Sequence, residues 1–498
     1  MKRLSILAGF FALSLQFAFG QPASSVVNEK RKTQVDTVVQ RLGNSFIAQP
    51  ARVGVSIGIT KDGQTYFYNF GEVEKGKKQI PTQNTIYEIG SISKTFASLL
   101  LAHAIVEQRV KATDDIRKYL GAGYANLAYK GKPIELIHLA NTTSSLPDNL
   151  PDLSALFQQV NPDSVGVVVN RKLKSYTKQN FYEDLRSVKL DTVPGLVPRH
   201  SNVATQLLAY ILEGVYQSSY SELVDKYIGK PCGMRGVRAL ATNASLLATG
   251  YNENGSKMAS YSVATMQASG GLRYSAADMV KYLQHQLNEH NKAVALTHQT
   301  TWETTDGQAI GFNWNIIKTV DSKRKLFHSG GTFGFASYCA FYPELGFGIV
   351  LLTNESDRST QGSLYDLSDK IVEGIYGTPA ALKAFRHQLL AQDYKQAAAI
   401  YKAVKADHRE FYLSEEYINE WGYKLAREGK TKQAIELFTL NTTLYPESWN
   451  TYDSLGEAYE MAGNKTLAVA NYQRSLTLNP QNTGAVDHLK KLGEATSK

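Results

Sequence analysis

The chain has 498 residues, of which 43% are hydrophobic and 20% charged, and its formal net charge is +9. This composition excludes a disordered chain, and the length exceeds that of one average domain, so we expect two or three folding units. An anionic partner such as nucleic acid or cell wall could explain the positive charge. Because lysine and arginine are spread along the whole chain, we interpret the charge as a solvated surface and predict no nucleic-acid partner.

Residues 1–20 have the layout of a cleavable secretion signal, in which Lys2 and Arg3 precede the apolar run 4–19 and small residues lie near Gly20. The alternative is a membrane anchor, but the run is shorter than the roughly 20 residues that span a bilayer. We therefore predict a secreted, periplasmic protein without stable membrane insertion.

Antiparallel strand pairs are expected near both ends of the first domain, which we predict to extend from residue 21 to residue 376. The patterns indicate strands at 53–60 with 65–70, and at 336–341 with 347–352. Helical periodicity lies between them, for example at 96–106 and 276–287. This order predicts an α+β domain, an antiparallel sheet flanked by helices with a helical subdomain.

A Ser-x-x-Lys pair occurs three times, at 91–94, 175–178 and 322–325. Only Ser91 follows a glycine at the end of a strand-and-turn segment and begins an amphipathic helix. An offset of three on a helix brings the Lys94 amine to the Ser91 hydroxyl, and the helix N-terminus favours a developing oxyanion. We predict that Ser91 is a nucleophile activated by Lys94, and that the other two pairs lie on the surface.

Several blocks in the right order resemble the class C β-lactamases and related D-amino acid peptidases and esterases. The likeness extends from about Gly54 to Asn354. Its blocks are 89–96, 114–120, 137–147, 194–208, 270–278 and 328–332. The resemblance implies the serine β-lactamase and penicillin-binding-protein fold, with an acyl-enzyme chemistry.

The second motif of that family usually reads Tyr-x-Asn, whereas this chain has His200-Ser201-Asn202. An imidazole, with an unperturbed pKa of about 6.5, could take over the proton transfer of the tyrosine. The resemblance further implies that Asn202 hydrogen-bonds the Lys94 amine or a substrate carbonyl.

The third motif, His328-Ser329-Gly330, stands where β-lactamases carry Lys-Thr-Gly. By resemblance, Ser329 and Gly330 flank the substrate, and the backbone N–H groups of Ser91 and Gly331 form the oxyanion hole. Losing the lysine removes a fixed cation that would hold a substrate carboxylate. We therefore expect an esterase or peptidase rather than an efficient β-lactamase.

The predicted reaction is acyl transfer through Ser91 to an ester, small amide, D-amino acid peptide or β-lactam, with no metal or organic cofactor. The histidines at 285, 290 and 298 are spaced too widely along a helix for a metal-ligand pair. An alternative is a non-catalytic binding protein with a decayed site, in which His200 and His328 mark the decay. The two cysteines, Cys232 and Cys339, are expected to be buried free thiols, although one disulfide remains open.

A 34-residue repeat marks residues 380–498, beyond a linker at 376–379. Gly422, Gly429, Ala434 and Pro446 recur 34 residues later. Small residues at fixed offsets let antiparallel helices pack closely, and the pattern resembles the tetratricopeptide repeat. The stretch 380–408 is expected to be a degenerate earlier hairpin. We predict a helical repeat domain that docks a protein partner or packs on the first domain.

Overall fold

The computed structural model describes residues 33–236, 242–261, 264–304 and 307–494. The predicted secretion signal lies outside these residues. Within the described ranges, no helix combines the length and the apolar character that a membrane crossing requires.

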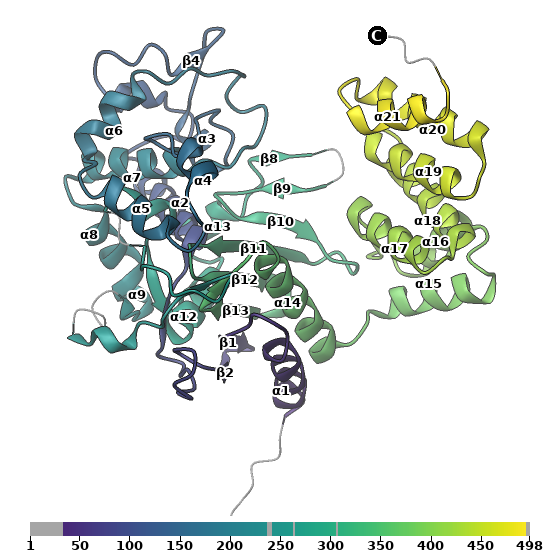
Figure 1. The fold of residues 1–498 in the computed structure, drawn as a ribbon, viewed down its shortest axis with the longest axis horizontal. Helices are drawn as coiled ribbons and strands as arrows, with labels where there is room; N and C mark the ends of the chain where they lie inside the picture. The colour runs from purple at the N-terminus through teal and green to yellow at the C-terminus, as the bar shows by residue number, and fades with distance from the viewer. Residues whose placement is uncertain (1–32, 237–241, 262–263, 305–306, 495–498) are drawn as a thin grey trace, which may run out of the picture.

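An antiparallel sheet forms the centre of the first domain (Figure 1). Its strand order is β2-β1-β13-β12-β11-β10-β9-β8. The bounds are β1 Gly54–Lys61, β2 Gln64–Gly71, β8 Trp302–Glu303, β9 Ala309–Ile310, β10 Asn315–Lys318, β11 Arg324–Gly331, β12 Ala336–Tyr342 and β13 Phe347–Thr353. The expected strand pairs are confirmed. The N-terminal hairpin of β1 and β2 pairs with β13 through β1. The first and last parts of the domain thus lie side by side in the sheet.

Both faces of the sheet are covered at its central strands, so β1, β12 and β13 are buried along almost their whole length. On one face, residues such as Ile57 and Tyr338 pack with α1 (Gln34–Ile47) and α14 (Thr360–Tyr376). On the other face, residues such as Cys339 and Leu352 pack in a core that includes α2 (Ser93–Val106) and α12 (Ala276–Gln286).

A helical subdomain is inserted between α2 and α12 and packs around α2. It contains α3 Leu136–Ala140, α4 Ser154–Gln159, α5 Val165–Leu173, α6 Lys178–Leu185, α7 Asn202–Tyr216, α8 Tyr220–Val224 and α9 Lys230–Cys232. Helix α2 is almost entirely buried, with Phe96 and Leu99 fully enclosed. A helix that is apolar all round belongs in the centre of a domain, and α2 therefore anchors the subdomain to the sheet.

The structure tests the predictions for the two cysteines and for the pair Ser322 and Lys325. Both cysteines are free thiols, Cys339 buried and Cys232 partly buried. The pair Ser322 and Lys325 was expected on the surface, and this is wrong for Lys325. Its side chain is buried and its amine lies 2.5 Å from Asp369 on α14, because strand β11 alternates and turns this residue toward the helix.

The C-terminal region is all helical and consists of helices packed in sequence (Figure 1). They are α15 Ala380–Ala391, α16 Ala397–Asp407, α17 Glu415–Arg427, α18 Thr431–Leu444, α19 Trp449–Met461, α20 Lys465–Leu478 and α21 Thr483–Lys491.

The recurring glycines of this region have two structural uses. A Cβ on Gly422 would lie 2.6 Å from the Phe438 ring, and one on Gly456 would lie 2.9 Å from the Tyr472 ring. Only a residue without a side chain lets the helices of each pair approach this closely. Gly429 and Gly463 follow α17 and α19 with φ of 76° and 74°, the left-handed conformation that ends a helix.

Candidate active site

Ser91 lies in a single turn of 3-10 helix, Gly90–Ile92, between the short strand β3 (Ile86–Glu88) and α2. The sequence predicts Ser91 at the start of the helix, whereas in the structure α2 begins two residues later, at Ser93. Gly90 has φ of +51°, and a Cβ there would lie 2.4 Å from the backbone nitrogen of Gly331. Both features require glycine, since they bring the Ser91 turn directly against the end of β11.

The Lys94 amine is buried beneath Ser91 and makes three contacts of 2.8 Å. Nζ donates to Ser91 Oγ, to Asn202 Oδ1 and to the backbone carbonyl of Ser269. Burial lowers the pKa of Lys94 to about 7, although the nearby Asp148 carboxylate opposes this shift. Both protonation states of the amine are therefore populated near neutral pH.

The neutral amine has two N–H donors and one lone pair. Asn202 Oδ1 and the Ser269 carbonyl can only accept, so they take the two donors. The lone pair then faces Ser91 Oγ, which is the geometry a base needs to remove the serine proton.

Asn202 begins α7, and Ser201 caps this helix by accepting from the Ala204 N–H. The Asn202 amide group donates through Nδ2 to Asn149 Oδ1 at 3.0 Å. This contact fixes the amide so that Oδ1 faces Lys94. The predicted Asn202–Lys94 contact is thus present.

His200 lines the same cavity as Ser91, and its Nδ1 lies 2.5 Å from Asp148 Oδ1. Burial disfavours the Asp148 carboxylate, but the hydrogen bond from His200 and the charges of His200 and Lys94 outweigh it and lower the pKa of Asp148. The role of Asp148 was not predicted from the sequence. Asp148 directly follows the block 137–147, and an acidic residue at this place next to a recognised block was the available signal.

His328 donates through Nδ1 to the carbonyl of Ser329 at 2.5 Å, which leaves Nε2 as an acceptor in the neutral ring. Burial and the charge of Lys94 lower the pKa of His328 to about 4. This position therefore carries no cation at neutral pH. Ser329, Gly330 and Gly331 line the cavity beside it, and a Cβ on Gly330 would lie 2.9 Å from the Ser91 nitrogen.

A buried carboxylate, Glu88, joins three segments around the site and was also missed by the sequence analysis. Its oxygens accept from Thr332 Oγ1 at 2.7 Å, and from Ser260 Oγ and the Tyr261 N–H at 2.7 Å. Thr332 directly follows Gly331, the last residue of β11. Glu88 thus holds both sides of the cavity relative to the Ser91 turn.

These residues meet in one cavity of about 530 Å³. Ser91, His200, Asn202, His328, Ser329, Gly330 and Gly331 all line it. Lys94 lies beneath Ser91 rather than on the wall. Leu153, Phe157, Val169, Tyr261 and Phe333 form an apolar part of the wall, and Asp148, Asn149, Ser269 and Thr332 add polar groups to it.

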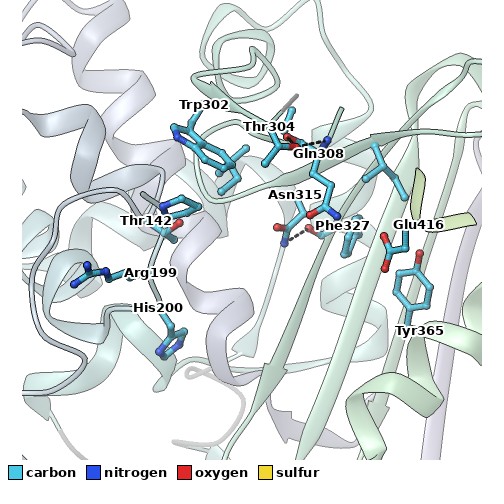
Figure 2. Close-up of a pocket in the computed structure, with 14 residues that line it drawn as sticks. Thr142, Arg199, His200, Trp302, Thr304, Gln308, Asn315, Phe327, Tyr365 and Glu416 are labelled. Carbon is cyan, nitrogen blue, oxygen red and sulfur yellow. Dashed lines mark hydrogen bonds between the residues drawn. The ribbon is translucent and has the colours of Figure 1, made fainter. Parts of the chain in front are cut away.

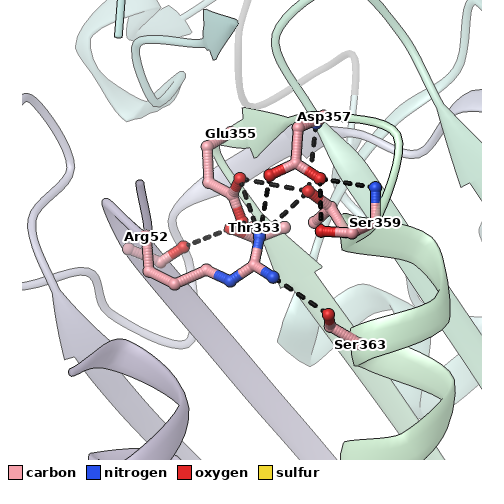
Figure 3. Close-up of polar contacts among 8 residues, drawn as sticks. Arg52, Thr353, Glu355, Asp357, Ser359 and Ser363 are labelled. Atoms are coloured by element: carbon pink, nitrogen blue, oxygen red, sulfur yellow. Dashed lines mark hydrogen bonds and ion pairs between the residues drawn. The ribbon is translucent and has the colours of Figure 1, made fainter. Parts of the chain in front are cut away.

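Two more wall residues are Ser356 in the short strand β14 (Glu355–Ser356) and Gln361 in the first turn of α14. A buried network holds this segment (Figure 3). The Arg52 guanidinium donates to both oxygens of Glu355, at 2.9 and 3.1 Å, and to Thr360 Oγ1 at 3.0 Å. Its other nitrogen donates to Ser363 Oγ at 3.0 Å. Strand β1, the loop and helix α14 are thereby tied together.

Comparison with known proteins gives the same architecture. The family model described as Beta-lactamase matches residues 35–367, more than half of the chain. A Beta-lactamase from Pseudomonas fluorescens is 24% identical over 368 residues, which cover 65% of this chain and 94% of that protein. The D-alanyl-D-alanine-carboxypeptidase/endopeptidase AmpH from Escherichia coli (strain K12) is 23% identical, over 70% of this chain and 91% of that protein.

Solved structures have the same fold. The Beta-lactamase/D-alanine Carboxypeptidase from Yersinia pestis, complexed with citrate, matches with a TM-score of 0.58 and 23% identity over 69% of this chain and 98% of that chain. Residues 35–367, which the family model matches, contain the Ser91 turn, the second motif and the third motif. The chain belongs to the β-lactamase family.

Proposed function

We propose that this chain is a secreted serine hydrolase that forms an acyl-enzyme on Ser91. The family match supports a serine hydrolase kind of function. The observation that carries the proposal is the 2.8 Å contact between the buried Lys94 amine and Ser91 Oγ. A decayed binding protein has no need to keep a buried lysine whose pKa lies near 7 against this hydroxyl.

The proposed reaction has two steps. Neutral Lys94 takes the Ser91 proton as Oγ attacks the substrate carbonyl carbon, and the backbone N–H groups of Ser91 and Gly331 stabilise the oxyanion. The leaving group departs with a proton, which leaves an ester on Ser91. Water then attacks that ester, and His200, oriented by Asp148, accepts the water proton before Ser91 regains one.

We propose esters, small amides and peptides with apolar groups as better substrates than β-lactams. The cavity wall is rich in aromatic and aliphatic side chains. Because His328 is neutral near pH 7, no fixed cation at this position grips a substrate carboxylate. Such a grip is the usual reason for a lysine at the third motif.

Residues 1–20 are proposed to direct export to the periplasm, and 21–376 and 380–498 to be two folding units. The proposed helical repeats resemble tetratricopeptide repeats and offer a surface for a protein partner. Support for the repeats comes from the 34-residue spacing and from the close helix contacts at Gly422 and Gly456.

The test is labelling with a fluorophosphonate probe, together with hydrolysis of p-nitrophenyl esters, nitrocefin and D-alanyl peptides. The expected result is labelling and ester hydrolysis that Ser91→Ala abolishes. Ser175→Ala is the matched control, because this exposed serine belongs to another Ser-x-x-Lys pair and should leave both signals intact. Labelling that is absent, or that survives Ser91→Ala, would support the decayed binding protein instead.

A further inference from the structure

A chain of side-chain hydrogen bonds joins His200, at the edge of the catalytic cavity, to the buried amine of Lys94. His200 Nδ1 lies 2.5 Å from Asp148 Oδ1, and the second Asp148 oxygen accepts from Asn149 Nδ2 at 2.7 Å. Asn149 Oδ1 accepts from Asn202 Nδ2 at 3.0 Å, and Asn202 Oδ1 accepts from the Lys94 amine at 2.8 Å. The chain therefore has Asp148 near its outer end and the amine at its inner end.

Backbone contacts hold the two segments that carry the middle of this chain. The carbonyl of Asp148 accepts from the N–H groups of Asn202 and Val203, at 2.9 and 3.3 Å. Ser201 Oγ donates to the Pro147 carbonyl at 2.7 Å. The loop that carries Asp148 is thereby fixed to the first turn of α7, so the side chains of the two segments stay within hydrogen-bond reach of each other.

The outer end of the chain also faces a second cavity, of about 560 Å³, because His200 lines both cavities (Figure 2). The walls of the second cavity come from the loop before α7, from strands β8 to β11, from α14 and from α17, which supplies Glu416. Arg199 lies beside His200 in Figure 2, but its guanidinium pairs with both oxygens of Asp191, at 2.7 Å. The imidazole is therefore the outer partner of Asp148.

The Asp148 carboxylate decides the direction of the bonds in this chain. An ionised carboxylate only accepts, so Asn149 must turn Nδ2 toward Asp148 and Oδ1 toward Asn202. Asn202 then donates through Nδ2 and presents Oδ1 to Lys94. If both amides were reversed, two acceptors would meet at Asp148, and an Asn202 N–H would occupy the lone pair of the neutral Lys94 amine. That lone pair would then be lost to Ser91.

We infer that Asp148 is a positioning residue for Lys94, in addition to being the partner of His200. It acts through the amides of Asn149 and Asn202, whose orientation keeps the lone pair of the neutral amine directed at the nucleophile. This inference rests on the proposed hydrolase function and adds to it the group that orients its base. The Asp148 side chain is 53% exposed, so solvent screens its charge, and the orientation of the two amides is its larger contribution.

The charge of Asp148 adds a pH signature. Burial lowers the pKa of Lys94 and the Asp148 carboxylate opposes this shift, so removing the carboxylate should lower the pKa further. Among the described residues, the other titratable side chains that face this pair belong to His200, His328 and Tyr261. Burial lowers the pKa of His328 to about 4 and raises the pKa of Tyr261, so both side chains are neutral near neutral pH.

The test follows the rate at which a fluorophosphonate labels Ser91, as a function of pH. Labelling joins Oγ to the probe phosphorus with fluoride as the leaving group, so it needs Lys94 but not the water attack assigned to His200. Asp148→Asn should move the rise of the rate to lower pH and lower its plateau about tenfold, as expected for one lost charge-assisted hydrogen bond. Asn149→Leu keeps the charge, so it should lower the plateau by a similar factor without that shift.

Asp152→Asn is the matched control. Asp152 lies in the same loop, but its carboxylate accepts from Ser154 and does not line the catalytic cavity. It should change neither the plateau nor the position of the rise. Combining Asp148→Asn with Asn149→Leu should lower the plateau no further than one change alone, since both interrupt the same chain. A rise that stays in place in Asp148→Asn, an equal shift in Asp152→Asn, or additive losses would overturn the inference.

The outcomes separate this inference from the proposed function. If Ser91 is labelled but Asp148→Asn leaves both quantities unchanged, the inference alone fails. If Ser91 is not labelled at all, the proposed function fails, and an NMR titration of Lys94 in protein with ¹³C-labelled lysine still tests the contact with Asp148. Lys94→Met identifies the resonance. A lower pKa of Lys94 in Asp148→Asn supports the contact, and equal values overturn it.

Discussion

Lys94 keeps two hydrogen bonds when its amine is neutral, whereas the direction of its third contact, with Ser91 Oγ, depends on protonation. A base at His200 would predict from the sequence that activity rises with pH through the titration of an imidazole. The structure assigns this rise to Lys94 instead, because burial lowers the pKa of this amine to about 7. A base must be unprotonated to act, so activity is low below this pH and rises as the proton leaves.

We therefore expect kcat/KM for an ester to rise about tenfold per pH unit below pH 7 and to level off above about pH 8. Lys94→Met should lower it at least about a thousandfold and remove the rise. His200→Asn serves as the control: it should lower activity but retain the rise. A flat profile, or a rise lost in His200→Asn, would contradict the assignment to Lys94.

The buried pair Arg52 and Glu355 acts at the level of elements, because it joins β1, the loop after β13 and α14 (Figure 3). Their side chains are 4% and 2% exposed. Burial raises the pKa of Glu355 even though Arg52 opposes this shift. Desolvation therefore outweighs the attraction to Arg52, and the pair serves geometry more than net stability.

Removing one partner should be far worse than removing both. Arg52→Ala leaves a buried carboxylate unpaired and should lower the free energy of unfolding by about 3 kcal/mol or more. The double variant Arg52→Met with Glu355→Leu should lose less. Urea unfolding followed by tryptophan fluorescence measures both. Lys257→Ala, which breaks an exposed pair with Glu74, is the control and should leave the free energy of unfolding nearly unchanged.

At the scale of the whole molecule, the hydrophobic cores of the two regions are almost separate. Among the described residues, the two sheet-side cores extend no further than Ile375, and Val320 of the first domain packs against the helical core. Ser91 and its partners all lie before residue 332. The catalytic cavity is therefore built entirely by the first domain, and the second cavity by both.

Deleting the chain after Pro379 should accordingly leave Ser91 labelled by a fluorophosphonate. The midpoint of thermal unfolding should fall, because Val320 loses the contacts that it makes with the helical core. The labelling rate and the midpoint of thermal unfolding report the two effects separately. An insoluble or unlabelled product would show that the helical region is required for the first domain to fold.

Local patterns predicted the elements well, because their causes are local. Apolar runs and turn residues located the strand pairs around residues 62 and 345, and a fixed glycine spacing located the paired C-terminal helices. The context of Ser91 singled out its Ser-x-x-Lys pair, whereas Asn202 and His328 came from the resemblance to the β-lactamase family. The prediction for Lys325 was wrong, because polarity along the chain cannot tell which way a strand residue faces or that Asp369 lies opposite it.

The sequence by itself determined the nucleophile pair, the order of the three motifs and the helical character of the C-terminal region, since each depends on residues close together in the chain. Only the tertiary structure decided the partners that come from far away: Asp148 for His200, Glu88 for Thr332, and Glu416 for the second cavity. The pKa of Lys94 belongs to the same group. It is set by burial, and burial depends on how the whole domain packs around one amine.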